Sequence, residues 1–195
     1  MFSIKKPFTI GIGGTHSGSG KTTIAVALLK YLTKDKQPWG AVKYSKTTSQ
    51  SSIVTDNKNL TEKGKDTFQL LMAGASDVVW VKSPPSRLDK VLPEAVKKLS
   101  GLDGIVIEGN SAIEFLKPDI VIFIFGEDKS RWKSGIERLF IDADIVLYRN
   151  ESELPEIVKT KKLFHIDPSD IEEHKRFFKL IKKIIDEKRI ERRDA

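Results

Sequence analysis

Residues 8–23 form a glycine-rich stretch, FTIGIGGTHSGSGKTT, that closes with a lysine and two threonines. Glycines let the backbone curl so that successive N–H groups point at phosphate oxygens, and a following helix adds its positive N-terminal end. In such a loop the lysine reaches the β- and γ-phosphates of a nucleotide, and the first threonine hydroxyl binds Mg²⁺. The stretch therefore predicts a phosphate-binding loop. The nucleotide-binding residues that it predicts are Thr15, His16, Ser17, Gly18, Ser19, Gly20, Lys21, Thr22 and Thr23.

The spacing departs from the common G-x-x-x-x-G-K-T pattern, because Thr15 stands where the first glycine is expected. A variant loop, K-G-G-x-G-K-T, is typical of the dimeric, signal-recognition and MinD-like branch of P-loop NTPases. Residues 16–22 read H-S-G-S-G-K-T and are similar to that variant, with His16 at the position of its additional lysine. Two interpretations of His16 stay open: it faces solvent, or it points at phosphate, including across a dimer interface.

Two further charged side chains end predicted buried strands. Glu108 closes the run GIVIE, where a carboxylate beside a phosphate loop would hold or orient Mg²⁺. Lys43 ends an earlier strand, where it is either a surface lysine or a point charge that meets a substrate anion. We predict Lys21, Lys43 and Glu108 as catalytic residues, and Thr22 with Glu108 as the metal ligands.

The nucleotide base and the general base are less well specified. Asn150 and Glu153 follow a predicted strand, at the place where guanine-binding relatives of this class carry N-K-x-D. Because Glu151 replaces that lysine, the pattern favours guanine over adenine only slightly, and both GTP and ATP stay open. Asp56 and Asp66 are candidates for the general base because a moving loop would bring a carboxylate to an attacking water or hydroxyl.

Strands alternate with helices along the chain, which predicts right-handed β-α-β units and a mainly parallel sheet. The predicted class is α/β, a three-layer sandwich of the P-loop NTPase type in the signal-recognition and MinD-like branch. The 195 residues suit a single nucleotide-binding domain over 1–195, with a flexible polar loop at about 45–63 and a closing helix at about 169–188. The other predicted elements are strands at 8–13, 39–44, 77–81, 104–108, 119–125, 144–148 and 163–166, and helices at 22–32, 66–75, 88–99 and 136–143.

Composition limits the partners. The chain has no cysteine, which excludes disulfides, thiolate zinc sites and iron–sulfur clusters and leaves oxygen or imidazole ligands for any metal. It has no apolar run near the roughly 20 residues that span a bilayer and no signal peptide, so we expect a cytoplasmic protein without a membrane partner. The net charge of +7 favours anionic partners. Much of that charge lies in the last twenty residues, whose apolar positions recur at helical spacing. This favours a packed terminal helix over a nucleic-acid arm.

Several stretches together resemble the molybdopterin-guanine dinucleotide biosynthesis protein B family: GGTHSGSGKTT, AVKY, GKDTFQLLMAGASDVVWV and LDGIVIEG. The G-K-D-T element at 64–67 and the A-G-A element at 73–75 are more specific than the phosphate loop. The resemblance covers about residues 8–109 and implies a GTP-binding, often dimeric protein that helps attach a nucleotide to molybdopterin, with weak hydrolysis.

The family usually has histidine-rich residues after the second-strand lysine and E-G-F/Y-K after the acidic strand. Here the chain has Tyr44, Ser45 and Lys46 at the first place, and Asn110 and Ser111 at the second. A divergent relative with another small anionic client therefore stays open.

The sequence thus leaves more than one function class. The first is a Mg²⁺-dependent GTP-binding protein or weak GTPase, working as a homodimer with molybdopterin or another anionic client. The alternative is an ATP-dependent small-molecule kinase or ligase, since dethiobiotin synthetase shares the loop spacing of residues 14–22 and a lysine after its second strand. A nucleic-acid binder is compatible with the basic C-terminus but has no further support.

Overall fold

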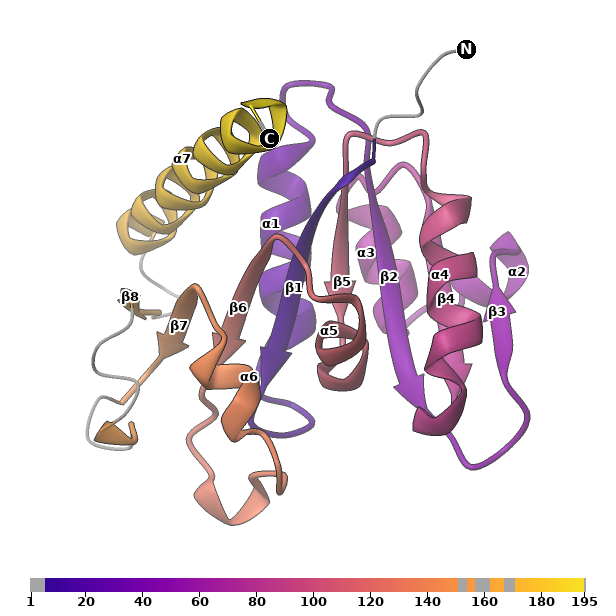
Figure 1. The fold of residues 1–195 in the computed structure, drawn as a ribbon, viewed down its shortest axis with the longest axis horizontal. Helices are drawn as coiled ribbons and strands as arrows, with labels where there is room; N and C mark the ends of the chain where they lie inside the picture. Colours follow the sequence, from indigo (N-terminus) through magenta and orange to yellow (C-terminus); the bar gives the residue numbers. More distant parts are fainter. Residues whose placement is uncertain (1–5, 151–153, 157–161, 167–170, 195) are drawn as a thin grey trace.

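A computed structural model describes residues 6–150, 154–156, 162–166 and 171–194. Within these residues, eight strands form one sheet in the order β3-β4-β2-β5-β1-β6-β7-β8 (Figure 1). Neighbouring strands run parallel, except that β3 is antiparallel to β4 at one edge. The predicted α/β class with a mainly parallel sheet is confirmed. The strands are β1 (Phe8–Gly14), β2 (Trp39–Lys46), β3 (Ser52–Val54), β4 (Val78–Ser83), β5 (Gly104–Glu108), β6 (Ile120–Ile124), β7 (Ile145–Tyr148) and β8 (Lys162–His165).

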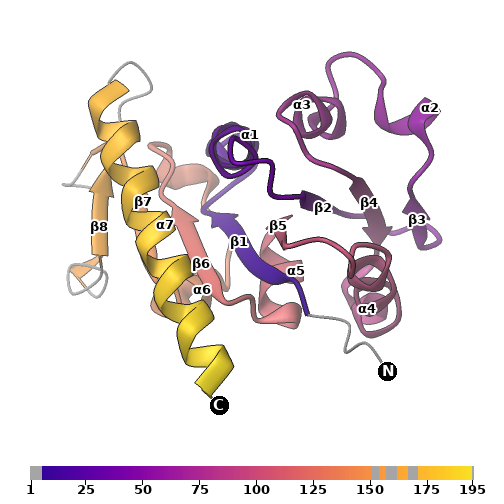
Figure 2. The ribbon, with the colours of Figure 1, turned by 90° about the horizontal axis from the view of Figure 1, so that it is seen from above.

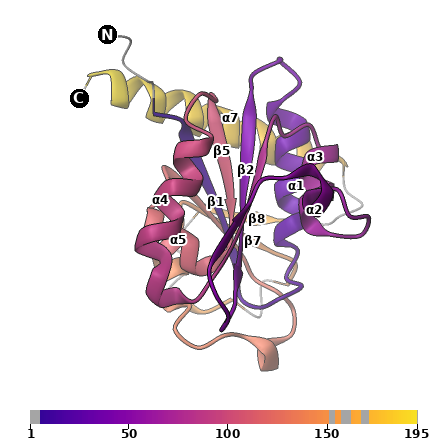
Figure 3. The same ribbon diagram turned by 90° about the vertical axis from the view of Figure 1, so that its right-hand side faces the viewer.

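Helices cover both faces of this sheet, because its central strands are apolar on both sides. Every residue of β5 and β6 is buried, as parallel strands between two helical layers require. Figure 3 shows α4 and α5 on one side of the sheet and α1, α2 and α3 on the other. The helices are α1 (Lys21–Leu32), α2 (Asn57–Leu60), α3 (Asp66–Met72), α4 (Leu88–Lys98), α5 (Asn110–Leu116), α6 (Glu137–Ile141) and α7 (Ile171–Asp194), with 3-10 turns η1 (Pro85–Arg87) and η2 (Lys129–Arg131).

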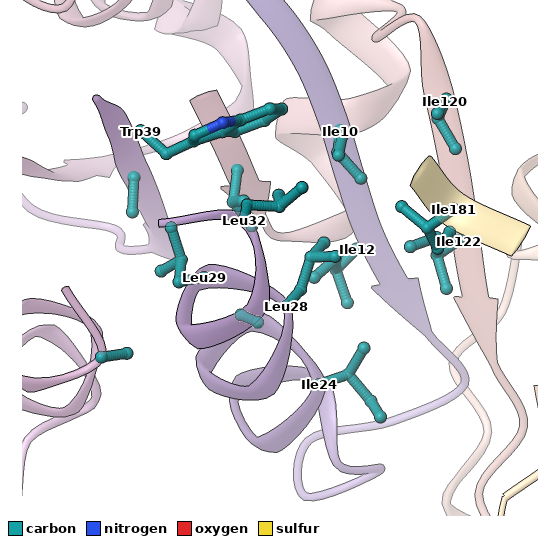
Figure 4. Packing of buried hydrophobic residues seen from close by; sticks show 14 of the residues in the cluster. Ile10, Ile12, Ile24, Leu28, Leu29, Leu32, Trp39, Ile120, Ile122 and Ile181 are labelled. Carbon is teal, nitrogen blue, oxygen red and sulfur yellow. The ribbon is translucent and has the colours of Figure 1, made fainter. Parts of the chain in front are cut away.

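The packing of α1 on β1 fixes the helix that follows the phosphate loop. Ile24 and Leu28 on α1 belong to the same buried cluster as Ile10 and Ile12 on β1 (Figure 4). Burying a side chain of this size contributes about 1.5–3 kcal/mol relative to leaving it exposed. These contacts hold the start of α1 close to the carboxyl end of β1, where the loop between them must turn.

The closing helix α7 packs on the face that α1 also covers. Its residues Phe177 and Ile181 are buried in the same cluster as the apolar side chains of β6 and β7, and Figure 2 shows α7 running past those strands. Part of its positive charge is paired within the chain: Lys188 contacts Asp144, 2.9 Å away, and Arg192 pairs with an aspartate at the start of β6. The prediction of a packed terminal helix is confirmed. None of the helices that the structure describes combines the length and apolar content needed to cross a bilayer.

Residues 45–63, predicted as a flexible polar loop, contain two short regular elements. The β-branched residues Ile53 and Val54 form β3, a short edge strand that pairs with β4. The helix α2 follows, and its last residue, Leu60, is buried beneath the start of α3. The hydroxyl of Thr67 donates to the Leu60 carbonyl oxygen at 3.0 Å. One buried side chain, one hydrogen bond and one strand pairing organise a stretch whose sequence has almost no apolar periodicity.

A helix was also missing from the sequence prediction. Residues 110–116 form α5, which packs beside β1 and β5 and buries Ala112 and Ile113. This segment begins with polar residues and gives fewer than two turns of apolar spacing, which is too short for helical periodicity to be recognised. Its position matters for function, because α5 begins two residues after Glu108.

Candidate functional site

The carboxyl ends of β1, β2 and β5 meet at one edge of the sheet, and the predicted phosphate loop turns there. Gly18 and Gly20 have φ angles of 85° and 95°, a left-handed conformation that glycine adopts without steric cost. The Lys21 ammonium group lies inside the turn and donates to the His16 carbonyl oxygen at 2.6 Å and to the Ser19 hydroxyl at 3.3 Å. The loop thus forms the compact turn before a helix N-terminus that binds phosphate groups in other proteins.

The environment of Lys21 lowers its pKa from 10.5 to about 8. Burial is the main cause, because it disfavours the charged form, and the positive charges of Lys133 and Lys43 lower the pKa further. The carboxylates of Glu108 and Asp66 act in the opposite direction. A buried ammonium group with this balance of neighbours favours an additional anion beside it, and phosphate is such an anion.

The second half of the site comes from β5, which is hydrogen-bonded directly to β1 and places Glu108 beside Ile12. Glu108 is only 2% exposed. Its two carboxylate oxygens accept from the Thr22 hydroxyl at 3.1 and 3.0 Å. The predicted pair of metal ligands therefore lies together.

Lys43 is not a surface lysine. On β2 it lies beside Glu108 in the parallel register, its ammonium group pairs with Glu108, and it contacts Asp66 at 2.6 Å. Burial by itself would lower the pKa of Lys43, but the two carboxylates outweigh burial and raise that pKa above its ordinary value. Asp66 is the first residue of α3, so the G-K-D-T element supplies the second carboxylate of this cluster.

The two candidate bases are separated by the fold. Asp66 belongs to the charged cluster just described. Asp56 lies at the start of α2, where its carboxylate accepts from the backbone and side-chain nitrogens of Asn59, and these hydrogen bonds lower its pKa. Its geometry is that of a helix cap, and the structure does not bring it to the phosphate loop.

His16 does not face solvent, because its side chain is buried at 6% exposure. Its Nδ1 lies 2.7 Å from the Ser17 carbonyl oxygen, which can only accept, so Nδ1 carries the proton. Its Nε2 is buried without a hydrogen-bond partner among the described residues. Nε2 packs against Gly126, where an added Cβ would lie 2.1 Å away, so this contact requires glycine.

Thr15 is buried as well and connects the loop to the end of β6. Its backbone nitrogen donates to the Ile124 carbonyl oxygen at 3.1 Å, and its hydroxyl accepts from the Gly126 nitrogen at 2.9 Å. Thr15, which replaces the first glycine of the common pattern, therefore attaches the phosphate loop to the end of β6.

The sequence singled out Asn110 only as a departure from the family pattern, but its side chain holds the end of β1, where the phosphate loop begins. Its amide oxygen accepts from the Gly14 nitrogen at 3.1 Å, and its amide nitrogen donates to the Gly14 carbonyl oxygen at 2.9 Å. Such a two-way amide contact fixes the end of β1. The sequence offered one hint of this contact: Asn110 closely follows the acidic strand, and a polar residue there lies at the same sheet edge as the phosphate loop.

Two residues of the segment 126–135, which follows β6, also reach the loop, and neither was predicted. Arg131 donates to the Ser17 carbonyl oxygen at 2.9 Å, and the backbone nitrogen of Lys133 donates to the Thr15 carbonyl oxygen at 2.9 Å. The signal in the sequence was a cluster of basic residues, KSRWK, shortly after a buried strand.

Two cavities lie on either side of the phosphate loop. The polar cavity has a volume of about 890 Å³ and is lined by charged side chains, including Lys21, Lys43, Asp66 and Glu108. The apolar cavity has a volume of about 340 Å³, and its walls come from the start of α1, the ends of β6 and β7, and α7. Among its lining residues are Phe125, Tyr148, Phe177 and Phe178.

Of the two predicted base-recognition residues, Asn150 follows residues that line the apolar cavity. Asn150 is exposed and comes two residues after the end of β7, and the neighbouring Tyr148 and Arg149 line the apolar cavity. Glu153 lies outside the described residues. Recognition of guanine by this pair stays a prediction.

A glycine-rich turn at a helix N-terminus, a partly buried lysine at its end, and a threonine on that helix bonded to a carboxylate at the end of the neighbouring strand define a P-loop nucleotide-binding protein. The family described as molybdopterin guanine dinucleotide synthesis protein B matches residues 9–133, which is more than half of the chain. The chain belongs to that family, and the resemblance found in the sequence is confirmed. No curated protein matches the sequence significantly.

Solved structures support the fold. HypB from Helicobacter pylori in complex with nickel superposes with a TM-score of 0.58 at 15% identity, covering 93% of this chain and 88% of that chain. The hydrogenase maturation factor HypB from Archaeoglobus fulgidus superposes with a TM-score of 0.51 at 13% identity, covering 91% and 90%. At these identities the similarity is one of fold.

Proposed function

We propose that this protein is a Mg²⁺-dependent GTP-binding protein with weak GTPase activity. Its role would be to assist the attachment of a guanine nucleotide to molybdopterin or to another small anionic client. The observation that carries the proposal is the cluster of Lys21, Thr22 and Glu108 at the adjacent ends of β1 and β5. Family membership supports the guanine nucleotide and the client.

The donor set fits Mg²⁺. This ion prefers oxygen ligands and usually takes one or two from the protein, with phosphate oxygens and water completing its shell. The Thr22 hydroxyl and the Glu108 carboxylate provide such oxygens 3.0–3.1 Å apart. The part of the chain that the structure describes holds no group of three or more His, Cys, Asp or Glu residues arranged for a metal, so an all-protein cage is not formed. When bound, Mg²⁺ would neutralise charge on the phosphate oxygens.

The residues of the chain act mainly by positioning and by charge. Lys21 would meet the terminal phosphates from within the loop, and Lys43 holds Glu108 in place by an ion pair. Asp66 is 44% exposed at its side chain and lies at the edge of the same cavity, where it can accept a proton from an attacking water. With no further group committed to the chemistry among the described residues, slow hydrolysis is the expected rate class.

The nucleoside would occupy the apolar cavity. Its volume of about 340 Å³ and its aromatic lining are those of a small-molecule pocket, which generally combines apolar walls with a few polar groups. Guanine would be recognised by Asn150 and Glu153, which follow β7. Titration calorimetry with non-hydrolysable GTP and ATP analogues tests this assignment, and a clear preference for ATP would reject it.

The phosphate assignment is tested by Lys21→Ala. Loss of the buried ammonium group should raise the Kd for nucleotide about 100-fold, because hydrogen bonds to a charged group contribute about 1.5–3 kcal/mol each. Lys30→Ala is the matched control, since Lys30 lies on the exposed face of α1. Equal affinity in Lys21→Ala and wild type, with both proteins folded by circular dichroism, would reject the site.

One observation supports a second candidate, an ATP-dependent small-molecule kinase or ligase. The polar cavity extends beyond the metal ligands to Lys46 and Ser111, which leaves room for a second substrate. A phosphate-release screen with molybdopterin, dethiobiotin precursors and small alcohols separates the two: strong stimulation by a small metabolite favours the kinase or ligase. The homodimer that the resemblance implies is measured by light scattering with and without nucleotide.

A further inference from the structure

The segment 126–135 is fastened to the phosphate loop at three points. The backbone nitrogens of Gly126 and Lys133 donate to the hydroxyl and to the carbonyl oxygen of Thr15, each at 2.9 Å. Arg131 donates to the Ser17 carbonyl oxygen at 2.9 Å. Within the segment, the Trp132 indole nitrogen donates to the Gly126 carbonyl oxygen at 3.2 Å and closes it into a compact turn. The segment is therefore held in a defined place over the loop.

This attachment puts a cation on each side of the loop. Arg131 lines the apolar cavity, and Lys133 lines the polar cavity together with Lys21, Thr22 and Glu108. Among the described residues, no carboxylate forms an ion pair with the Lys133 ammonium group. Its charge is therefore not committed to a partner in the fold.

The loop itself supplies only one cation at this place. His16 stands where the variant loop carries its additional lysine, but its ring is tied to the Ser17 carbonyl oxygen through Nδ1 and packed against Gly126 through Nε2. The ring is buried in that position. A terminal phosphate beside Lys21 would need a second cation from elsewhere in the chain.

The charge of Lys133 acts at the right place. The backbone hydrogen bond from Lys133 to Thr15 keeps Lys133 at the polar cavity that Lys21 also lines. Lys43 is drawn toward Glu108 and Asp66 by its ion pairs, whereas Lys133 is not. An anion placed between Lys21 and Lys133 would relieve the repulsion between them.

We propose that Lys133 is a second phosphate-binding cation, which contacts the terminal phosphate of a bound nucleoside triphosphate from within the same chain. It would take the part that the variant loop assigns to a lysine at position 16. The inference rests on the proposed nucleotide function and adds to it a residue that distinguishes a triphosphate from a diphosphate.

The test is Lys133→Ala, with the affinities for a non-hydrolysable GTP analogue and for GDP measured by calorimetry in the presence of Mg²⁺. Loss of one charge-assisted contact should raise the Kd of the triphosphate analogue about tenfold and change that of GDP less than about twofold. Lys129→Ala removes the same charge from the same segment but outside both cavities, and should change neither Kd. Lys133→Arg should recover most of the discrimination.

Equal weakening of both nucleotides, or no change in either, would overturn the role of Lys133. The selective loss of affinity for the triphosphate is the readout that a merely structural role would not give. If Lys21→Ala abolishes binding while Lys133→Ala has no effect, this inference fails and the proposed function stands. If the wild-type protein binds neither nucleotide, the proposed function itself fails.

Discussion

The two cavities beside the phosphate loop are built from opposite chemistry. The polar cavity is lined at the ends of β2 and β5 by ionisable groups, with Lys43 between Glu108 and Asp66. The apolar cavity is formed by aromatic side chains from β6, β7 and α7, such as Tyr148 and Phe177. The polar cavity is suited to groups whose charge is transferred or neutralised. The apolar cavity is suited to binding a flat ring without reacting with it.

The difference follows from where the walls come from in the chain. In a parallel sheet the carboxyl ends of the central strands converge, so single charged residues at the ends of buried strands meet there. The apolar wall instead depends on α7, the last element, whose buried face continues the core of the domain. The phosphate loop lies between the two and takes contacts from both.

The largest effect should come from removing the carboxylate on the polar side. Glu108→Gln keeps the size of the side chain but loses its charge, so Mg²⁺-dependent turnover should fall at least about 100-fold, since metal neutralisation of phosphate charge supplies several kcal/mol. Nucleotide affinity measured without Mg²⁺ should change little, because Lys21 remains. Turnover with and without Mg²⁺ by phosphate release measures the effect.

Glu114→Gln serves as the control for Glu108→Gln. Glu114 is an exposed carboxylate that lines the same cavity, so it matches the change in charge without touching Thr22. If both variants lose turnover equally, the cavity responds to its net charge, and Glu108 has no special role as a metal ligand.

On the apolar side, Phe178→Ala should weaken nucleotide binding without slowing turnover at saturation. Phe178 lines the cavity and stacks on Tyr31 with ring centroids 5.0 Å apart. Base–aromatic contacts contribute about 1–3 kcal/mol, so a rise of about tenfold in Kd is expected. Phe115→Ala removes an exposed ring from α5, outside both cavities, and should leave Kd unchanged. An unchanged Kd in Phe178→Ala would place the base away from this cavity.

The polar side was more predictable from sequence than the rest of the site, for a physical reason. Glu108 ends a buried strand, and Lys21 and Thr22 begin the helix after the glycine-rich turn that follows another strand, so the order of strands and helices alone brings them to one edge. The contact of Lys43 with Asp66 depends on where α3 docks, which the sequence does not encode locally. The attachment of the segment 126–135 depends mostly on hydrogen bonds that involve backbone atoms, and such bonds do not require a particular side-chain type.

His16 shows the same limit from within the motif. Its position suggested either solvent or phosphate, and the fold gave a buried ring because Gly126, more than a hundred residues later, leaves space for it. The edge strand β3 is a similar case, since Ile53 and Val54 gain their pairing only from β4. The burial of His16 and the pairing of β3 both depend on residues far away in the chain, so local sequence periodicity could not predict them.

The smallest expected effect is a pH dependence that belongs to the polar side alone. The folded-state pKa of Lys21 is about 8, below its ordinary 10.5, so the folded protein loses this proton before the unfolded chain does. Below pH 8 the buried charge of Lys21 therefore lowers the free energy of unfolding by its full amount. Between about pH 8 and 10.5 this penalty disappears, so the free energy of unfolding rises. Bound phosphate favours the charged form, so nucleotide binding takes up a proton, and affinity falls as pH rises through about 8.

Between pH 7 and 8.5 the Kd should rise about fourfold, the ratio expected for one group with this pKa. Lys43 should not contribute, because its pKa is raised and it stays protonated over this range. Calorimetry in two buffers of different ionisation enthalpy measures the proton uptake, which should be about half a proton at pH 8. Lys21→Arg keeps a permanent charge and should give a flat profile, whereas a slope that persists in that variant would assign the titration to another group. Phe178→Ala should weaken binding at every pH and leave the slope unchanged, because the phenyl ring of Phe178 carries no ionisable group.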